Sequence, residues 1–392
     1  MPLKDHEKIN QDEIKNVLEE HFGKITKDPR VNSAVMGVET LDKDFEWVGV
    51  HGPADLNAEP IRPDTPVWIA SVTKLYIAST ILKLSEKGLV DIDAPMAAYL
   101  PADLIQGIHH TSDGVDHTDK ITIRNLLSHS SGLADYLEES PEDEEGLMDQ
   151  VFDGNDREFS IIEAMNLLRT HLPAHFPPQQ HNGNKKKIRY SDTNYQLLIE
   201  IIKKIKEQSF HDVLTEIIYG PLGLESTFHP GTRFGNSSKE AAVVWSGDQP
   251  LNTPKAMRSF GDLNSTVRDM IKFMRGLING NFFDHPETWQ MMQRDFASFG
   301  FSLDPSPKSP PWPVEYGLGI MRLEMPRLFT LFNPIPAAIG HTGVSGSWLF
   351  YCSEYNLILS GTVNQVAAAA LPFRFLPMLL SDRRLKVLSQ GI

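Results

Sequence analysis

The sequence predicts an α+β fold in which both ends of the chain build one antiparallel sheet, interrupted by a helical insertion. Strand patterns occur near the N-terminus, in residues 33–39 and 45–52, and return near the C-terminus, in residues 316–324, 346–353 and 356–364. Between them, residues 90–254 hold short helical patterns, prolines and acidic loops, with few strand signals. Helical patterns also lie outside the strands at both ends. Elements segregated in this way are typical of α+β proteins.

The N-terminal elements follow from the spacing of apolar residues. Residues 11–25 carry their apolar side chains at helical intervals, which predicts one amphipathic helix. The two N-terminal strands are joined by a polar turn around Asp42. Residues 69–87 are apolar around most of a helical circumference, so we expect a long, mostly buried helix that Gly88 caps in a left-handed conformation.

The remaining elements complete the predicted division of the chain. Short helices are expected in the insertion, and a further helix at residues 266–277 leads back to the strands. A last helical pattern covers residues 377–388. We therefore expect a sheet domain formed by residues 1–90 and 255–392, a helical insertion domain formed by residues 91–254, and an active site in the cleft between them.

The composition of the chain argues against some classes of binding partner. Among the 392 residues, 41% are hydrophobic and 22% are charged, as in a soluble globular protein. The net charge of −14 argues against nucleic acid, which needs a basic face. No apolar run approaches the roughly 20 residues of a membrane span. Residues 1–13 lack the apolar core of a secretory signal, which predicts a cytoplasmic protein unless a leader preceded this chain.

Cysteine content and charge distribution add two further points. The single cysteine, Cys352, excludes an internal disulfide and a thiolate-rich metal site, and no cofactor or metal is expected. Residues 135–163 hold twelve carboxylates and one basic residue, Arg157. This stretch is either a solvated surface or an acidic lip that disfavours anionic substrates. The sequence says nothing about oligomeric state.

A candidate nucleophile stands at the start of the long helix. Ser71 and Lys74 are three residues apart, so they share one helix face and the amine reaches the hydroxyl. At a helix N-terminus the hydroxyl also faces unpaired N–H groups that favour a developing anion. Burial lowers the pKa of a lysine, so Lys74 is expected to serve as a neutral base. By itself, S-x-x-K is a weak signal because it occurs by chance in many helices.

Two further segments make the signal specific. Y-S-D at residues 190–192 opens another helix, and G-H-T-G at residues 340–343 precedes a strand. In this order the three segments resemble the S-x-x-K, Y-x-N and K-T-G boxes of penicillin-binding proteins and serine β-lactamases. The chain is most similar to the class C β-lactamase, D,D-peptidase and family VIII carboxylesterase branch. Residues 126–133, 221–227, 261–266 and 316–319 also look like that family, and the match runs from about residue 33 to 364.

The resemblance implies a fold and a set of roles. The family's β-lactamase/transpeptidase-like fold is an antiparallel sheet flanked by N- and C-terminal helices, with an inserted all-helical domain. By this likeness Ser71 becomes acylated, and Lys74 and Tyr190 pass its proton to the leaving group. The backbone N–H groups of Ser71 and Val344 would form the oxyanion hole.

The resemblance also implies the residues that bind substrate. His341 and Thr342 would face the substrate from an edge strand, and Gly343 would leave room for it. Asp192 stands where the family's asparagine binds an acylamino side chain. By contrast, His129 in the L-L-S-H-S-S-G-L segment is expected to pack or hydrogen-bond at the domain junction, without catalytic duty.

Two departures from the family bear on the substrate. Many members have lysine where His341 stands, and histidine is half-neutral near pH 7, so it holds a carboxylate less securely. Asp192 replaces an amide that both donates and accepts, whereas an ionised carboxylate only accepts. This loss of a donor disfavours β-lactamase activity. An ionised Asp192 is also expected to lie near Lys74, to pair with it and to favour its charged form.

These observations predict a serine hydrolase that cleaves a small ester or amide through an acyl-Ser71 intermediate. A carboxylesterase is the first interpretation. A D-Ala-D-Ala carboxypeptidase or D-aminopeptidase comes second, and a weak β-lactamase third. The non-enzymatic alternative is a covalent penicillin-binding sensor or scaffold on the same fold. The presence of all three boxes favours the enzyme.

Overall fold

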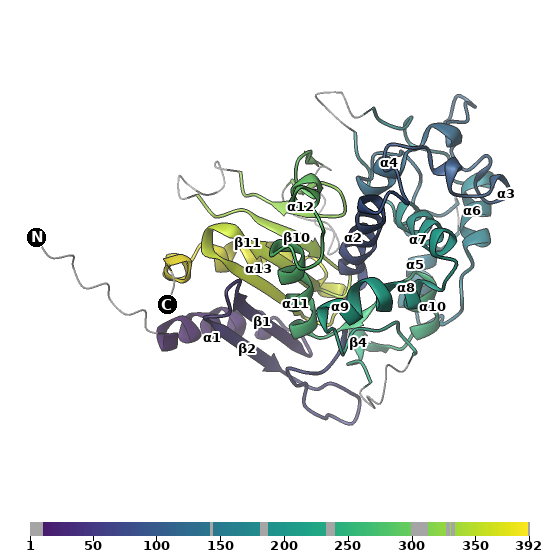
Figure 1. Ribbon diagram of the computed structural model, residues 1–392. Coiled ribbons are helices and arrows are strands. Elements are labelled where there is room, and N and C mark those ends of the chain that lie inside the picture. The colour runs from purple at the N-terminus through teal and green to yellow at the C-terminus, as the bar shows by residue number, and fades with distance from the viewer. Residues whose placement is uncertain are drawn as a thin grey trace, which may run out of the picture.

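One eight-stranded antiparallel sheet forms the centre of the protein (Figure 1). The computed structural model describes residues 11–141, 144–180, 187–232, 240–298, 313–326, 330 and 334–390. The strand order is β2-β1-β12-β11-β10-β9-β8-β7. In chain order the strands are β1 (Ala34–Thr40), β2 (Glu46–His51), β7 (Ala297–Ser298), β8 (Glu315–Tyr316), β9 (Met321–Leu323), β10 (Ala338–Thr342), β11 (Ser347–Cys352) and β12 (Leu357–Thr362).

Both ends of the chain contribute to this sheet. β1 pairs with β12 in a continuous antiparallel register that runs from Val35 opposite Thr362 to Thr40 opposite Leu357. β12 pairs in turn with β11, and β11 with β10. The segments from the two ends of the sequence are therefore adjacent strands, as the strand patterns predicted.

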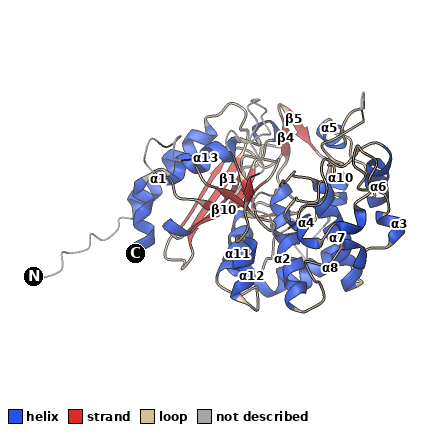
Figure 2. Cartoon of the chain, turned by 90° about the horizontal axis from the view of Figure 1, so that it is seen from above, coloured by secondary structure: helices blue, strands red, loops and turns tan. Residues whose placement is uncertain are grey.

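Helices cover both faces of the sheet (Figure 2). α1 (Gln11–Thr26), α13 (Leu371–Leu380) and a 3-10 helix (Arg383–Gln390) pack on one face. α11 (Val267–Ile278) packs on the other face, against β1, β11 and β12. The flanking N- and C-terminal helices agree with the expected fold.

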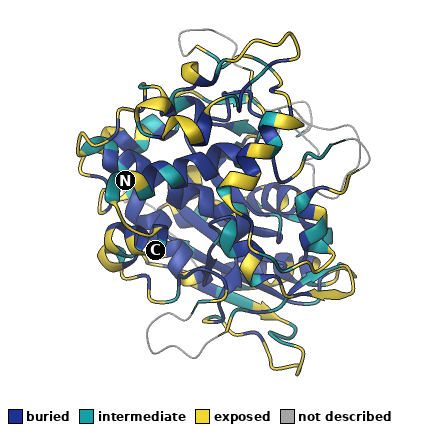
Figure 3. Cartoon of the chain, turned by 90° about the vertical axis from the view of Figure 1, so that its right-hand side faces the viewer, coloured by how far each residue is buried: buried dark blue, intermediate teal, exposed yellow. Residues whose placement is uncertain are grey.

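The helical part of the chain lies beside the sheet, around α2 (Thr73–Glu86). Eleven of the fourteen residues of α2 are buried, and the helix packs against α7 (Asp192–Lys206). Figure 3 shows this interior in the buried colour, with exposed residues along the outer helices and loops. The other helices here are α3 (Ala102–Ile105), α4 (Ile123–Leu127), α5 (Leu147–Phe152), α6 (Ile161–Thr170), α8 (Phe210–Leu214), α9 (Gly220–Leu222), α10 (Pro254–Ser259) and α12 (Pro286–Met292).

Three expectations need correction. The predicted strand at residues 316–324 is a hairpin, because the chain turns through Gly319 at φ +76° between β8 and β9. The insertion is not wholly helical, since β4 (Val244–Ser246) and β5 (Gln249–Leu251) form a small hairpin within it. The last long helix, α13, begins at Leu371, earlier than the predicted residue 377.

The end of α2 and the lengths of the helices can be compared with the predicted helix cap and with the length of a membrane span. Gly88 follows α2 with a left-handed φ of +69°, which confirms the predicted cap. In the described ranges, none of the helices combines the length and the apolar character that crossing a bilayer requires.

Candidate active site

Ser71 lies in a single 3-10 turn, Ala70–Val72, that leads directly into α2. The preceding residue, Ala70, has a left-handed φ of +45°, a conformation that costs a non-glycine residue about 1–3 kcal/mol. The surrounding structure holds the turn in place. Ser345 Oγ donates to the carbonyl of Trp68 and Ser347 Oγ to the carbonyl of Ile69, each at 2.7 Å. The turn that carries Ser71 is therefore fixed to the loop between β10 and β11 and to the first residue of β11.

Lys74 joins two of the predicted site residues. Its Nζ donates to Ser71 Oγ at 3.1 Å and forms an ion pair with Asp192 Oδ1. Burial alone would lower the pKa of Lys74, but the nearby Asp192 carboxylate and Tyr190 raise it above the ordinary value. Lys74 is therefore an ammonium at rest and not a neutral base, because it forms the expected pair with the Asp192 carboxylate.

Tyr190 completes the group. It immediately precedes Ser191, the N-cap of α7, and the Lys74 Nζ lies 5.0 Å from the centroid of its ring. Burial raises the pKa of the Tyr190 phenol, although the Lys74 ammonium and hydrogen bonds with Lys74 and Ser71 act in the opposite direction. The phenol is therefore protonated at neutral pH. Ser71, Lys74, Tyr190 and Asp192 meet at one place.

The proposed oxyanion donors face the same space. Ser71 and Val344 both line one cavity, and among the described residues neither backbone N–H donates to another protein group. Gly343 is required here by a close approach, since a Cβ at this position would lie 2.5 Å from the carbonyl oxygen of Ile69. The glycine thus makes room for the turn that carries Ser71, whereas the sequence suggested that it leaves room for a substrate.

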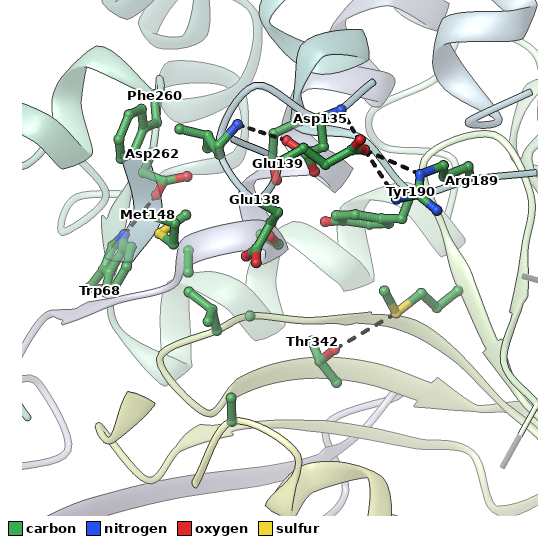
Figure 4. Close-up of a pocket in the computed structure, with 18 of the residues that line it drawn as sticks. Trp68, Asp135, Glu138, Glu139, Met148, Arg189, Tyr190, Phe260, Asp262 and Thr342 are labelled. Carbon is green, nitrogen blue, oxygen red and sulfur yellow. Dashed lines mark hydrogen bonds and ion pairs between the residues drawn. The ribbon is translucent and has the colours of Figure 1, made fainter. Parts of the chain in front are cut away.

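The cavity has a volume of about 380 Å³, within the range of pockets that bind small molecules. Figure 4 shows Glu138 and Tyr190 pointing toward the same space, with Trp68 and Asp262 at one side and Thr342 opposite. Its lining comprises Trp68, Ala70, Ser71, Asp135, Leu137, Glu138, Glu139, Met148, Arg189, Tyr190, Asp192, Phe260, Asp262, Met321, Thr342, Gly343, Val344, Ala369 and Phe373. Within the described ranges, no group of His, Cys, Asp and Glu side chains is arranged to hold a metal ion.

Carboxylates dominate the charge of this lining. Five acidic residues and one basic residue, Arg189, border the cavity. Burial, together with the charges of Asp192 and Glu138, raises the pKa of Asp135 well above its ordinary value. Three of the acidic residues come from the carboxylate-rich stretch 135–163, of which residues 142 and 143 lie outside the described ranges. This geometry favours the interpretation of that stretch as an acidic lip.

Asp262 and Trp68 were not identified from the sequence. Trp68 Nε1 donates to Asp262 Oδ2 at 3.0 Å, and both side chains line the cavity. Burial raises the pKa of Asp262 to about 7, despite the opposing charge of Lys74. The available signals were the position of Trp68, three residues before Ser71, and the G-D-L-N-S-T segment around Asp262.

His341 does not lie where the sequence predicted. Its side chain is fully buried and is not part of the cavity lining. Its Nδ1 lies 2.6 Å from the Thr342 carbonyl oxygen and its Nε2 lies 3.0 Å from the Tyr316 hydroxyl. Burial and the charge of Lys74 lower the pKa of His341 to about 3, so the imidazole stays neutral throughout the range of pH 5–8.

Thr342 does reach the cavity. β10 is not an edge strand, because it pairs with β9 over residues Ala338 to Gly340. That pairing ends at Gly340, while β10 continues to pair with β11 as far as Thr342. The end of β10 thus projects beyond β9, which explains how a strand inside the sheet contributes to the cavity.

Comparisons with known proteins agree with the architecture. The family model described as Beta-lactamase matches residues 24–373. Beta-lactamase-like protein 2 of Dictyostelium discoideum is 25% identical over 67% of this chain and 45% of its own length. Esterase EstB of Burkholderia gladioli is 29% identical over 44% of this chain and 41% of its own length. This chain thus spans less than half the length of either relative.

A solved structure extends the likeness to the whole fold. The D-amino acid amidase from Ochrobactrum anthropi SV3, complexed with D-phenylalanine, aligns with a TM-score of 0.70 at 21% identity. The alignment covers 96% of this chain and 98% of the amidase. At this level of identity the likeness establishes the fold alone.

Proposed function

This chain belongs to the beta-lactamase family, and we propose that it is a serine hydrolase that cleaves a small ester or amide through an acyl-Ser71 intermediate. A carboxylesterase is the activity that we favour. The observation that carries the proposal is the position of Lys74, which bridges Ser71 and Asp192 beside Tyr190 at the cavity. A serine hydroxyl is a weak nucleophile unless an adjacent group takes its proton.

Acylation begins with a proton transfer within the ion pair. Asp192 takes a proton from the Lys74 ammonium, and the resulting amine takes the proton of Ser71 as Oγ attacks the substrate carbonyl carbon. Tyr190 then protonates the leaving group, Lys74 returns a proton to Tyr190, and Asp192 returns one to Lys74. The net transfer is one proton from Ser71 to the leaving group, and every other group recovers its initial state.

The negative charge of the tetrahedral intermediate is stabilised by the backbone N–H groups of Ser71 and Val344. Such preorganised donors are worth about 2.7–4 kcal/mol each in a water-excluded site. In deacylation, water takes the place of the leaving group and the same side chains move protons in the reverse order. The Ser71 ester is hydrolysed and the free serine is restored.

The acidic residues that line the cavity favour the binding of substrates that carry no carboxylate. A carboxylate at the mouth would be repelled by Glu138 and by the ionised form of Asp262. Arg189, the one basic residue among the described residues of the lining, already pairs with Glu139. β-Lactams and D-Ala-D-Ala peptides carry such a carboxylate, whereas simple esters do not. A D-aminopeptidase or amidase is the second candidate, because the same lining would accept a free amine.

A panel of charge-matched substrates tests this proposal. We expect p-nitrophenyl butyrate to exceed mono-p-nitrophenyl succinate in kcat/KM by about tenfold or more, since 1.4 kcal/mol of repulsion suffices. A D-Ala-D-Ala peptide and a chromogenic cephalosporin should be poor substrates. The panel is measured side by side, together with a D-amino acid p-nitroanilide. A preference for the succinate ester or the cephalosporin would contradict the esterase assignment.

Asp192 gives a second prediction. Asp192→Asn removes the proton acceptor, so kcat for a simple ester should fall by about 100-fold or more, as for other acid–base groups. The amide can donate to an acylamino carbonyl, and a buried unpaired acceptor costs about 1–3 kcal/mol. The ratio of kcat/KM for an N-acyl-D-Ala-D-Ala peptide to that for the ester should therefore rise by about ten- to a hundredfold.

A matched aspartate controls for general effects. Asp382 forms an ion pair with Arg384 and lies near His21 of α1, away from the cavity. Asp382→Asn therefore also replaces an ion-paired carboxylate with an amide. It should leave both rates unchanged. An unchanged ester rate in Asp192→Asn would show that Asp192 is not the proton acceptor. An unchanged ratio would show that it does not exclude acylamino substrates.

A further inference from the structure

Tyr190 depends on its neighbours for its position, because it lies outside regular structure. It immediately precedes Ser191, the N-cap residue at which α7 begins. A side chain in a loop has no helical or strand register to orient it. Misplacement of a reacting group by about 1 Å can lower a rate about a hundredfold. The contacts that hold this residue therefore matter for any proton transfer through its phenol.

His129 holds the backbone on both sides of Tyr190. The N–H of Arg189, the preceding residue, donates to the carbonyl oxygen of His129 at 2.9 Å. The N–H of Ser191, the following residue, donates to His129 Nδ1 at 3.2 Å. The imidazole also lies against the tyrosine ring, with centroids 4.3 Å apart and planes inclined by 32°. One residue thus anchors the backbone and the ring of Tyr190.

The hydrogen bonds determine which nitrogen of His129 carries the proton. A backbone N–H only donates, so the bond from Ser191 requires Nδ1 to be an acceptor. Asn194 agrees with this assignment, because its Oδ1 accepts from Ser131 Oγ at 2.6 Å and its Nδ2 therefore faces His129 Nδ1, at 3.1 Å. His129 is neutral with its proton on Nε2. Burial and the charges of Lys74 and His341 lower its pKa well below the ordinary value, in accord with this state.

The backbone of His129 is unusual as well. Its φ is +53°, in the left-handed region that only a few per cent of non-glycine residues adopt, with asparagine, aspartate and histidine the most frequent among them. The residue is 1% exposed, and its ring also contacts those of Tyr195 and Tyr316. Among the described residues, its Nε2 has no hydrogen-bond partner. The contacts that satisfy polar groups of His129 thus all lead to residues 126, 189, 191 and 194.

We infer that His129 is a positioning residue that, as the neutral Nε2–H tautomer, sets the place of the Tyr190 phenol against Ser71 and Lys74. The inference rests on the proposed function for its effect on rate, but the anchoring contacts stand without it. His129 is not among the residues that line the cavity, so a substrate bound there would not touch it directly. Its influence on catalysis acts through Tyr190.

Two substitutions separate the imidazole from the backbone conformation. His129→Gly suits the positive φ and keeps the carbonyl, but it removes Nδ1 and the ring. We expect kcat for p-nitrophenyl butyrate to fall by about 10- to 100-fold, with KM changing less than about threefold, because substrate binding is untouched. His129→Asn also suits this φ, and its Oδ1 can accept from Ser191 in place of Nδ1. It should restore kcat to within about fivefold of wild type.

A matched histidine controls for loss of stability. His21 in α1 is also buried, and its Nε2 lies 3.1 Å from Asp382 Oδ2 on the far face of the sheet. His21→Ala should lower Tm without changing kcat. Wild-type kcat in His129→Gly, or equally low kcat in His129→Gly and His129→Asn, would overturn the inference.

The tautomer provides a readout that does not depend on activity. In ¹⁵N–¹H NMR of the wild-type chain at pH 7, with the resonance assigned from His129→Asn, Nδ1 of His129 should be unprotonated and Nε2 protonated. A protonated Nδ1 would overturn the inference whatever the rates. If the wild type hydrolyses no ester and Ser71 takes up no acyl probe, the proposed function is wrong. The NMR result then still decides whether His129 anchors the Tyr190 loop in the predicted state.

Discussion

Replacing Ser71 with alanine is expected to lower kcat for ester hydrolysis by about a million-fold, the loss seen when such nucleophiles are removed from serine hydrolases. The acyl-enzyme cannot form without Oγ, so covalent labelling by a fluorophosphonate probe should disappear as well. Both losses should occur with little change in fold, because Ser71 lies at the cavity and its side chain hydrogen-bonds with Lys74 and Tyr190, which belong to the same site. Intact-mass spectrometry and stopped-flow kinetics measure the two effects.

Ser79 is the matched control for this experiment. It lies in the same helix, α2, and its buried hydroxyl has no hydrogen-bond partner among the described residues. Ser79→Ala should therefore retain full turnover and labelling. Residual activity of Ser71→Ala above about a thousandth of wild type would assign the nucleophile to another residue.

Lys74 and Tyr190 are expected to act as one proton path, with the second largest effect. Lys74→Met and Tyr190→Phe should each lower kcat by about a hundred- to ten-thousand-fold, the range for general acid–base groups. Both keep most of the side-chain volume. Because either change interrupts the same path, the double variant should lose little more than the slower single variant. Single-turnover acylation of the four proteins measures this coupling.

Lys83 controls for the loss of an ion-paired lysine from α2. Its Nζ forms an ion pair with Asp284 Oδ1 at 2.7 Å, so Lys83 resembles Lys74, which pairs with Asp192. Lys83→Met should change Tm and leave acylation unaffected. If the two losses at Lys74 and Tyr190 multiply in the double variant, the residues act independently and the shared path is wrong.

Several features of the protein followed from short stretches of sequence. The helical or alternating spacing of apolar residues predicted α1, β1, α2 and α11. The interval between apolar residues shows which face of a helix or strand is buried. The three-residue interval between Ser71 and Lys74 predicted their contact for the same reason, because the 3-10 turn of Ser71 leads directly into α2 and keeps both side chains on one face. These features depend on neighbours along the chain.

The family likeness reached further, because it joined segments that spacing alone cannot relate. Residues 71–74, 190–192 and 340–343 are far apart in the sequence, yet their order resembled that of a known fold. The match of the family model over residues 24–373 confirms this recognition. The substrate was not determined in this way, because the cavity walls come from loops whose positions depend on packing.

The sequence by itself thus determined the fold class, the family, and the pairing of Ser71 with Lys74. The pairing of Asp192 with Lys74 was also predicted, but only the tertiary structure decided how deeply these groups are buried and which effect on each pKa prevails. The pKa of Lys74 is raised because Asp192, 118 residues away, neutralises it in a buried place, whereas burial alone would lower it. His341 is neutral and hidden because the side chains of Tyr316 and Tyr190 pack against its imidazole, and the charge of Lys74 opposes its protonation. Charge, burial and hydrogen bonding depend on which groups lie close together in space. Segments that are far apart in the sequence come close together only when the chain folds.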